Sequence, residues 1–340
     1  MEFVLQKFVF LRFKKYHLMT RKLLLFFNIL AVVAFFDSCS TKVDLYGDYK
    51  DIAIVYGLLD YTLDTNYIRI GKAFMGYGDA EEIAQIADSC NYPGKLEAKL
   101  IETQTNRVIE LDTITMYNKE AGIFYNDVQP VYYTTENINP TRNYKLEITK
   151  PDGSLITSST SIVGGESFKI TNTSINLSST AQKASVTWSP ATNASLYEII
   201  LSFEWEESDV TKKIEMSLGT HKTSEITMDH GAMTLPFSPQ LFFNTLQTYF
   251  SDDPDPSSVV RRFNRDNFKI SIAAGGQDLA TYIEANAPSS SIAQSTLDWT
   301  NIKNGYGVFS SRVNIEKRVP ISTQTAIELT EKGWGFVVIE

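Results

Sequence analysis

Histidine side chains are the first candidates for chemistry, because imidazole accepts and donates protons near neutral pH. His221 and His230 lie in no H-E-x-x-H, C-x-x-C or G-x-S-x-G pattern. Asp229-His230-Gly231 is typical of a turn after a strand. Ser-His pairs can assemble from residues that are far apart in the sequence. A hydrolase whose site is not visible in the sequence is therefore a third functional hypothesis, after the two binding functions given below. We expect a protein that is not an enzyme.

Carboxylates are concentrated in Ser251-Asp252-Asp253-Pro254-Asp255-Pro256, where three acids fall within six residues. Calcium prefers hard oxygen ligands of this kind. The prolines stiffen the stretch, and no Glu is spaced as in a calcium-binding loop. We therefore expect an acidic linker, no metal and no cofactor, with Asp252, Asp253 and Asp255 as the calcium ligands of the alternative interpretation.

An apolar run near the start of the chain predicts export. Leu23–Phe36 is fourteen residues long and follows Arg21 and Lys22, whereas a helix that spans a bilayer needs roughly 20 residues. A basic segment, a short apolar run and a small residue at the cut are typical of a secretory signal. We expect a signal peptide at 1–38, with translation starting at Met19.

The cysteine at the expected cut could carry a lipid. Phe36-Asp37-Ser38-Cys39 resembles the lipobox of bacterial lipoproteins, which implies an acylated Cys39 and a lipidated tether at 39–49. The alternative is an ordinary cleaved signal with an incidental cysteine. An acylated Cys39 leaves Cys90 without a partner, so no disulfide framework is expected.

The charge of the chain excludes one class of partner. The net charge is −9, and removing residues 1–38, with six Lys and Arg and two acids, makes it four units more negative, at −13. Proteins that bind nucleic acid carry basic patches or stripes. We therefore expect no nucleic-acid partner.

Residues 50–165 contain short alternating runs of β-branched and aromatic residues between turn formers, which predict strands. Their spacing favours an immunoglobulin-like or transthyretin-like β-sandwich. Asp79 with Glu82 predicts a capped helix at 79–87, and Pro151-Asp152-Gly153 predicts a hairpin turn. The expected strands are 51–59, 67–74, 96–103, 108–116, 123–134, 144–150 and 155–163.

Residues 166–340 predict a second sandwich, beginning after the Gly pair of Val163-Gly164-Gly165-Glu166. Ala184–Pro190 and Leu196–Trp205 resemble the second and third strands of a fibronectin type III domain. Further strands are expected at 168–175, 212–217, 222–228, 268–273 and 307–314, with helices at 238–250, 258–264 and 278–286 as insertions at about 237–266 and 277–287. The expected fold class is mainly β, with two tandem immunoglobulin-like or fibronectin type III-like β-sandwiches, the second carrying helical insertions.

Three stretches carry a wider resemblance: Ile54–Asp60, Tyr67–Phe74 and Asn301–Phe309. With the lipobox, they resemble an uncharacterised family of Bacteroidota envelope lipoproteins that have two β-sandwich domains. The resemblance implies a lipid-anchored protein of the cell envelope, at the outer membrane, and leaves open which side it faces. It implies no activity.

We expect a non-enzymatic envelope lipoprotein that presents a binding surface to an envelope protein or a glycan. The alternative is an accessory subunit of an outer-membrane nutrient uptake or secretion complex. Long insertions on a rigid scaffold often serve recognition, and Tyr and Arg are enriched at interface hot spots. The candidate contacts are Tyr249 and, at helix-like spacing, Arg261, Arg262 and Arg265.

One modification site is also expected. Asp112-Thr113-Ile114 fits the Asp-Ser/Thr-aliphatic pattern on which Bacteroidota O-glycosylate exported proteins, and it makes Thr113 the candidate acceptor.

Lipidation predicts a change in detergent partitioning. In two-phase extraction, Cys39→Ala should move the protein from the detergent phase to the aqueous phase, because two or more acyl chains hold a protein on a membrane. Cys90→Ala is the matched control and should stay in the detergent phase. Equal partitioning of the unchanged chain and Cys39→Ala would contradict lipidation.

Overall fold

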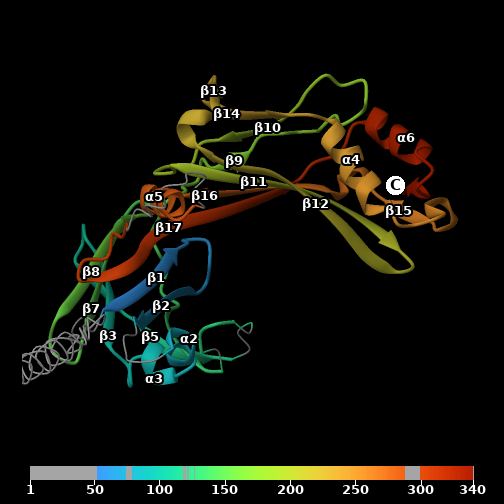
Figure 1. Cartoon of the computed structure of the whole chain (residues 1–340). Helices are drawn as coiled ribbons and strands as arrows, with labels where there is room; N and C mark the ends of the chain where they lie inside the picture. The colour runs from blue at the N-terminus through green and yellow to red at the C-terminus, as the bar shows by residue number, and fades with distance from the viewer. Residues whose placement is uncertain are drawn as a thin grey trace, which may run out of the picture. The chain divides into compact units, whose positions relative to one another are not determined.

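The computed structural model describes residues 52–73, 79–117, 120, 122–125, 127–287 and 299–339. The expected signal peptide at 1–38, Cys39 and the tether at 39–49 lie outside these residues. The described chain is mainly β, as the sequence predicts, and its strands form several packed sheets (Figure 1). None of its described helices has the length and apolar character that crossing a membrane requires.

The first half of the chain forms two sheets. Its strands are β1 (Ala53–Leu59), β2 (Asn66–Lys72), β3 (Glu97–Glu102), β4 (Arg107–Glu110), β5 (Asp112–Met116), β6 (Gln129–Thr134), β7 (Asn143–Thr149) and β8 (Leu155–Ser161), with the short helices α2 (Ala80–Ala84) and α3 (Ala87–Cys90). One sheet has the order β4-β3-β7-β8, and the other includes β1-β2-β6-β5. The strand expected at 108–116 divides at buried Leu111, because β4 pairs with β3 in one sheet and β5 with β6 in the other.

The inner faces of these two sheets enclose the first core. Alternate residues of β1, Ala53, Val55 and Leu59, are fully buried, as period-two strands require. They meet Leu100 of β3 and Leu146 of β7 in one apolar cluster. Two local predictions are confirmed at its margin, because the Asp79 carboxylate caps α2 by accepting the Glu81 N–H at 2.8 Å and residues 151–153 form the β7–β8 turn.

The second half repeats this arrangement. Its strands are β9 (Lys169–Ile170), β10 (Ala184–Ser189), β11 (Leu196–Glu207), β12 (Val210–Lys222), β13 (Thr227–Asp229), β14 (Ala232–Phe237), β15 (Arg261–Phe263), β16 (Phe268–Gly275), β17 (Gly305–Arg318) and β18 (Phe336–Val338), and its helices are α4 (Gln240–Tyr249), α5 (Gln277–Ala285) and α6 (Thr323–Glu331), with the 3-10 turns η1 (Thr223–Glu225), η2 (Pro256–Ser258) and η3 (Arg265–Asn267). The sheet β13-β14-β10-β9 packs against a longer sheet around β11, and together they bury a second core.

The strand assignment in the second core follows the predicted alternation. On β10, Val186 and Trp188 are fully buried. On β11, every second residue from Tyr197 to Phe203 is fully buried. Helix α4 confirms the helix expected at 238–250, and its Phe242 and Leu246 are also buried. The insertion therefore covers the end of this core.

The helix expected at 258–264 is wrong. The chain makes the 3-10 turn η2 and then strand β15, in which Arg261 and Phe263 are buried and Arg262 between them is exposed. This in–out–in pattern has the period of a strand. Strand β15 pairs with β11 on one side and with β18 on the other, so tertiary pairing overrides the local helical pattern.

Strand β17 belongs to both halves. Its residues Gly305–Ser311 pair in parallel with β1, and Arg312–Arg318 pair antiparallel with β16. The result is one continuous sheet in the order β18-β15-β11-β16-β17-β1-β2-β6-β5, with β12 beside β11 (Figure 1). The prediction that the strand at 307–314 belongs to the second sandwich alone is therefore wrong. The division into two domains at residue 165 stays a prediction.

Glycines make the β17–β1 pairing possible. Gly307 has φ +110°, and a Cβ there would clash with the Val55 carbonyl oxygen. A Cβ on Gly57 would lie 3.1 Å from side-chain atoms of both Ile68 and Phe309. Gly305-Tyr306-Gly307 begins strand β17, which lies directly against β1.

A second contact fixes the two cores to each other. Tyr61 packs against both apolar clusters, and a Cβ on Gly164, at φ +128°, would clash with its ring. The Ser311 hydroxyl donates to the Leu59 carbonyl at 2.7 Å and accepts the Val163 N–H at 3.0 Å. At the expected domain boundary, Gly164 of the Gly pair therefore packs directly against the Tyr61 ring.

Because β17 contributes to the first core, alanine substitutions at two of its aromatic residues should differ in their effect on the free energy of unfolding. Phe309 is fully buried in the first core, so Phe309→Ala should lower the free energy of unfolding by about 3–5 kcal/mol. Tyr306 is 46% exposed on the other face, and Tyr306→Ala should change it by about 0.5 kcal/mol or less. Urea denaturation measures both, and equal effects would contradict the packing.

Candidate functional site

The three stretches that carry the family resemblance become neighbours in the structure. Ile54–Asp60 includes most of β1, Tyr67–Phe74 includes most of β2, and Asn301–Phe309 leads into β17. These strands lie side by side in the order β17-β1-β2. Their inner face fills the first core, so their outer face is where side chains can meet a ligand.

The outer face carries tyrosines. In β1 and β2, Tyr56 and Tyr67 point away from the core, and each is 44% exposed. Tyr67 lies opposite Tyr133 of β6, with ring centroids 6.3 Å apart. Large exposed aromatics on the paired strands of a sheet are held in place by the backbone beneath them, so they provide contact area at little entropic cost.

Helix α5 closes one side of this face. It lies along β17, where the Leu279 N–H donates to the Ser310 hydroxyl at 3.3 Å (Figure 1). Between α5, the sheet and the β1–β2 connection is a groove of about 450 Å³, within the range usual for ligand sites. We call it the tyrosine groove. Its described lining residues are Tyr56, Gly57, Leu58, Leu63, Thr65, Asn66, Tyr67, Leu279, Tyr282, Ile283, Val308 and Arg312.

Tyr282 joins the helix to the sheet across the tyrosine groove. Its hydroxyl donates to the Tyr56 hydroxyl at 3.3 Å, and the two rings meet edge to face at 6.1 Å. Burial, together with this hydrogen bond, raises the pKa of Tyr282 to about 12. The phenol therefore stays neutral at physiological pH. Trp299 packs against the same ring at 6.5 Å.

Arg312 is the charged residue among the described lining of the tyrosine groove. It is exposed and makes no ion pair or side-chain hydrogen bond with another described residue. Nearby on β2, Arg69 is used differently, since its guanidinium donates to the Pro130 carbonyl at 3.0 Å and to Asn91 Oδ1 at 2.8 Å. Burial lowers the pKa of Arg69. Of these two arginines, only Arg312 lines the tyrosine groove.

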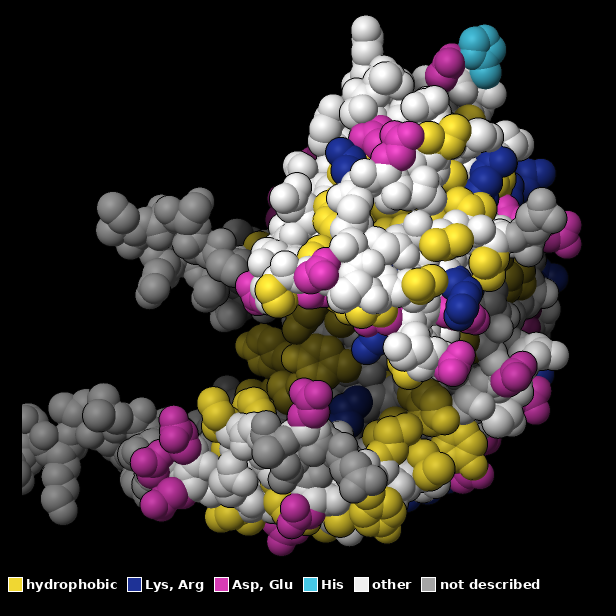
Figure 2. All heavy atoms as spheres, turned by 90° about the vertical axis from the view of Figure 1, so that its right-hand side faces the viewer, with side chains coloured by type: hydrophobic (Ala, Val, Ile, Leu, Met, Phe, Trp, Pro, Cys, Tyr) yellow, Lys and Arg dark blue, Asp and Glu magenta, His cyan; other side chains and the backbone are white. Residues whose placement is uncertain are grey.

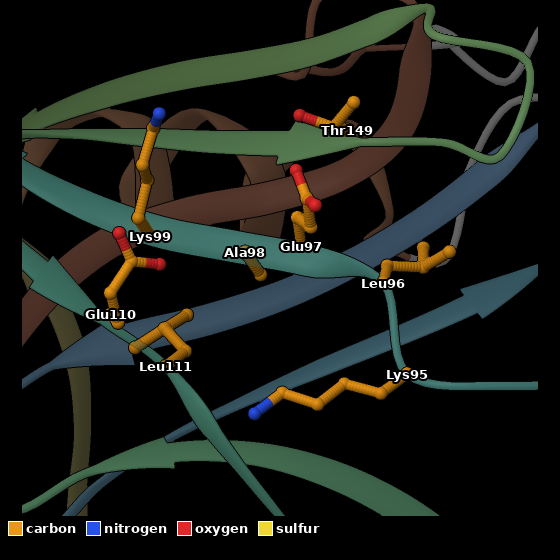
Figure 3. A pocket seen from close by; sticks show the side chains of 8 residues that line it. All are labelled: Lys95, Leu96, Glu97, Ala98, Lys99, Glu110, Leu111 and Thr149. Carbon is orange, nitrogen blue, oxygen red and sulfur yellow. The ribbon is translucent and has the colours of Figure 1, made fainter.

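A second hollow lies on the outer face of β3 and β4 and is polar. It has a volume of about 530 Å³, and Figure 3 shows that the side chains of Lys95 and Lys99, which line it, point in different directions. Its two lysines are paired, because Lys99 pairs with Glu147 at 3.1 Å and Lys95 with Asp112 at 2.9 Å. Lys145 and Lys99 lower the pKa of Glu147 accordingly. With both lysines paired and Glu97 and Glu110 also in its lining, this hollow offers no free cation among its described residues.

The prediction that Arg261 is available to a partner is wrong. Arg261 is 3% exposed, and its Nε donates to Glu207 at 2.7 Å, while its Nη2 lies 3.5 Å from Asp253. Nη1 donates to the carbonyls of Pro256 and, at 2.9 Å, of Trp334. The guanidinium ties β15 to the loops around it, which is a structural role.

The other predicted contact residues are separated. Tyr249 is 47% exposed at the end of α4, but its ring packs on Trp205 at 5.3 Å. Arg262 is exposed on β15, and Arg265, in η3, donates to the Ile321 carbonyl at 2.9 Å. Without the expected helix, the arginines form no stripe. Their role in binding stays a prediction.

The acidic stretch satisfies its own turns. The Asp253 carboxylate accepts the Asp255 N–H at 3.1 Å as well as pairing with Arg261, and Asp255 accepts from the Ser257 hydroxyl at 2.6 Å. Asp252 accepts from Ser251 at 3.3 Å. Within the described parts of the chain, no three His, Cys, Asp or Glu side chains group closely enough to hold a metal ion.

The remaining candidates lie apart from the tyrosine groove. His230 and Gly231 form the β13–β14 turn, as predicted, with φ +49° and +81° and the histidine side chain 94% exposed. Thr113 is half-buried on β5, the last strand of its sheet. On the face shown in Figure 2, acidic and basic side chains are interspersed.

The tyrosine groove could not be predicted from the sequence, because its walls come from segments over 200 positions apart. The available signal was the placement of Tyr56 and Tyr67 at the outward positions of alternating strands, each in a stretch that carries the resemblance. The insertion expected at 277–287 is α5, which supplies the third wall. The insertion at 237–266 covers the second core instead.

Comparisons with known proteins add little. No protein-family model and no curated protein matches the sequence. Among solved structures, one similar chain comes from a cytokine receptor complex, with 7% identity, a TM-score of 0.21, and coverage of 65% of this chain and 90% of that chain. At that level of overlap, the likeness says nothing of what this chain binds or does.

The two neighbouring arginines of β15 should differ in their effect on stability. Arg261→Ala leaves the carboxylates of Glu207 and Asp253 without their buried partner and should lower the free energy of unfolding by about 3 kcal/mol. Arg262→Ala, at an exposed position, should change it by about 0.5 kcal/mol or less. Urea denaturation checks this, and an Arg261→Ala protein as stable as the original would contradict the structural role.

Proposed function

We propose that this chain is a non-enzymatic, lipid-anchored cell-envelope protein that binds a ligand in the tyrosine groove. The observation that supports it is the set of three tyrosines, Tyr56, Tyr67 and Tyr282, around one hollow. Cys39 is the proposed anchor, which puts the groove on a protein tethered to a membrane surface.

The chemistry of the tyrosine groove suits binding. Tyr and Arg are enriched at binding hot spots, because each combines a large contact surface with directional hydrogen bonds. The Tyr282 phenol, whose pKa burial raises to about 12, is protonated near neutral pH as an ordinary tyrosine is, and it donates a hydrogen bond to the Tyr56 hydroxyl. The apolar side chains of Leu63, Leu279 and Ile283 line the groove together with the tyrosine hydroxyls. A bound ligand would displace water from these apolar surfaces.

The scaffold supports recognition by fixed geometry. In the sheet order β17, β1 and β2 are interior strands: β1 pairs with β17 and β2, β2 pairs with β1 and β6, and β17 pairs with β1 through Gly305–Ser311 and with β16 through Arg312–Arg318. The first core packs beneath them, and α5 is held at its start by the Gly276 N–H, which donates to the Ser311 carbonyl at 3.0 Å. A site on such elements loses little freedom when it binds, which favours affinity.

Binding assays on oligosaccharide and peptide arrays, with the full chain in detergent, test the proposal. We expect a ligand whose affinity falls roughly tenfold or more in Tyr56→Ala and in Tyr282→Ala, as for hot-spot tyrosines. Tyr306→Ala, on the same face but outside the tyrosine groove, is the matched control, and Tyr249→Ala tests the other candidate surface.

Two results would contradict this site. Affinity that is unchanged in both groove variants but reduced in Tyr249→Ala would place binding at the end of the second core. Turnover of a substrate that disappears in His230→Ala would make the protein an enzyme.

A further inference from the structure

We infer that the ligand of the tyrosine groove is an acidic glycan, whose sugar rings pack on the tyrosines and whose carboxylate pairs with Arg312. This inference rests on the proposed function and names the ligand class for the same groove. Charge, the chemistry of the aromatic groups and the position of the groove in the sheet each support it.

Charge is the first argument. The chain has a net charge of −9, yet the described lining of the tyrosine groove contains Arg312 and no carboxylate. Some basic side chains elsewhere are paired, as Lys95 is with Asp112 and Arg261 with Glu207. Arg262 is exposed like Arg312 but does not line the tyrosine groove. An arginine without a described partner, at the edge of an apolar hollow, is complementary to an anion. Its planar fork fits a carboxylate through two parallel hydrogen bonds.

The aromatic groups are the second argument. A sugar ring has C–H faces that pack on an aromatic ring and hydroxyls at its rim that need hydrogen-bond partners. Tyr56 and Tyr67 present exposed rings, and the Tyr56 hydroxyl, which accepts from Tyr282, keeps its own hydrogen to donate. Thr65 adds a further hydroxyl to the lining. The tyrosine groove therefore offers apolar faces and polar tips together.

The position in the sheet is the third argument, and it disfavours an extended peptide. Peptides that bind sheets add a strand at an open edge, where free backbone N–H and C=O groups pair with them. Beside the groove, Tyr56 and Gly57 of β1 pair with β17 on one side and with β2 on the other, and the tyrosine groove lies on the face of these strands. Recognition here must use side chains. A ligand made of rings with peripheral hydroxyls and a carboxylate satisfies that requirement without backbone pairing.

The experiment compares tetragalacturonate with its carboxyl-reduced form, using isothermal titration calorimetry on the full chain in detergent. We expect the acidic sugar to bind at least roughly tenfold more tightly than the reduced one, the size of effect that a hydrogen bond to a charged group gives. Raising the salt concentration should narrow this difference, because it screens an exposed pair.

Variants assign the charge preference to one residue. Arg312→Gln should remove the preference for the acidic sugar, and Arg312→Lys should restore part of it. Arg262→Gln is the matched control, an exposed arginine away from the tyrosine groove, and should change neither affinity. Tyr56→Ala should weaken both sugars alike.

The outcomes separate this inference from the proposed function. Equal binding of the two sugars, or a preference that persists in Arg312→Gln, overturns the acidic-glycan inference while the tyrosine groove stands as a binding site. If the chain binds acidic peptides but neither sugar, and Tyr56→Ala loses peptide binding, the acidic-glycan inference is likewise overturned and the tyrosine groove still stands as a binding site. A different result would contradict the proposed function itself. In that case the Tyr56→Ala and Tyr282→Ala variants would bind every ligand with the same affinity as the unchanged chain.

Discussion

The structure depends on the direct backbone contact between β17 and β1. These strands are separated by about 250 positions in sequence, and they pair residue for residue from Ala53 with Gly305 to Leu59 with Ser311. Any side chain at Gly307 would clash with the Val55 carbonyl, so the pairing requires glycine there. Through this contact one strand completes the first core with Phe309 and continues into the second with Val313.

The same contact determines where a ligand can bind. A β-strand presents alternate side chains to opposite faces. Once Val55 and Phe309 face the core, Tyr56 and Val308 must face outward, where α5 brings Tyr282 over them. The tyrosine groove is thus the outer counterpart of the first core.

Three arginines illustrate how burial assigns different roles to one residue type. Arg261 is enclosed, and carboxylates and carbonyls satisfy its donors, so it holds loops together. Arg69 is half-buried against neutral oxygens, and burial lowers its pKa. Arg312 stands at the rim of an apolar hollow with its charge presented to solvent. Composition and spacing alone could not separate them, because a side chain's partners are set by the fold.

The sequence by itself determined what depends on near neighbours: the alternation of Tyr197 to Phe203, the Asp79 cap, the turn at 151–153, helix α4 and the mainly β character. It missed what depends on distant pairing. Val108–Met116 divides at Leu111 between two sheets, and 258–264 becomes a strand because β11 and β18 flank it. The tyrosine groove appears only in the folded chain, since strand pairing across the sequence brings its three walls together, and local propensity carries no information about that pairing.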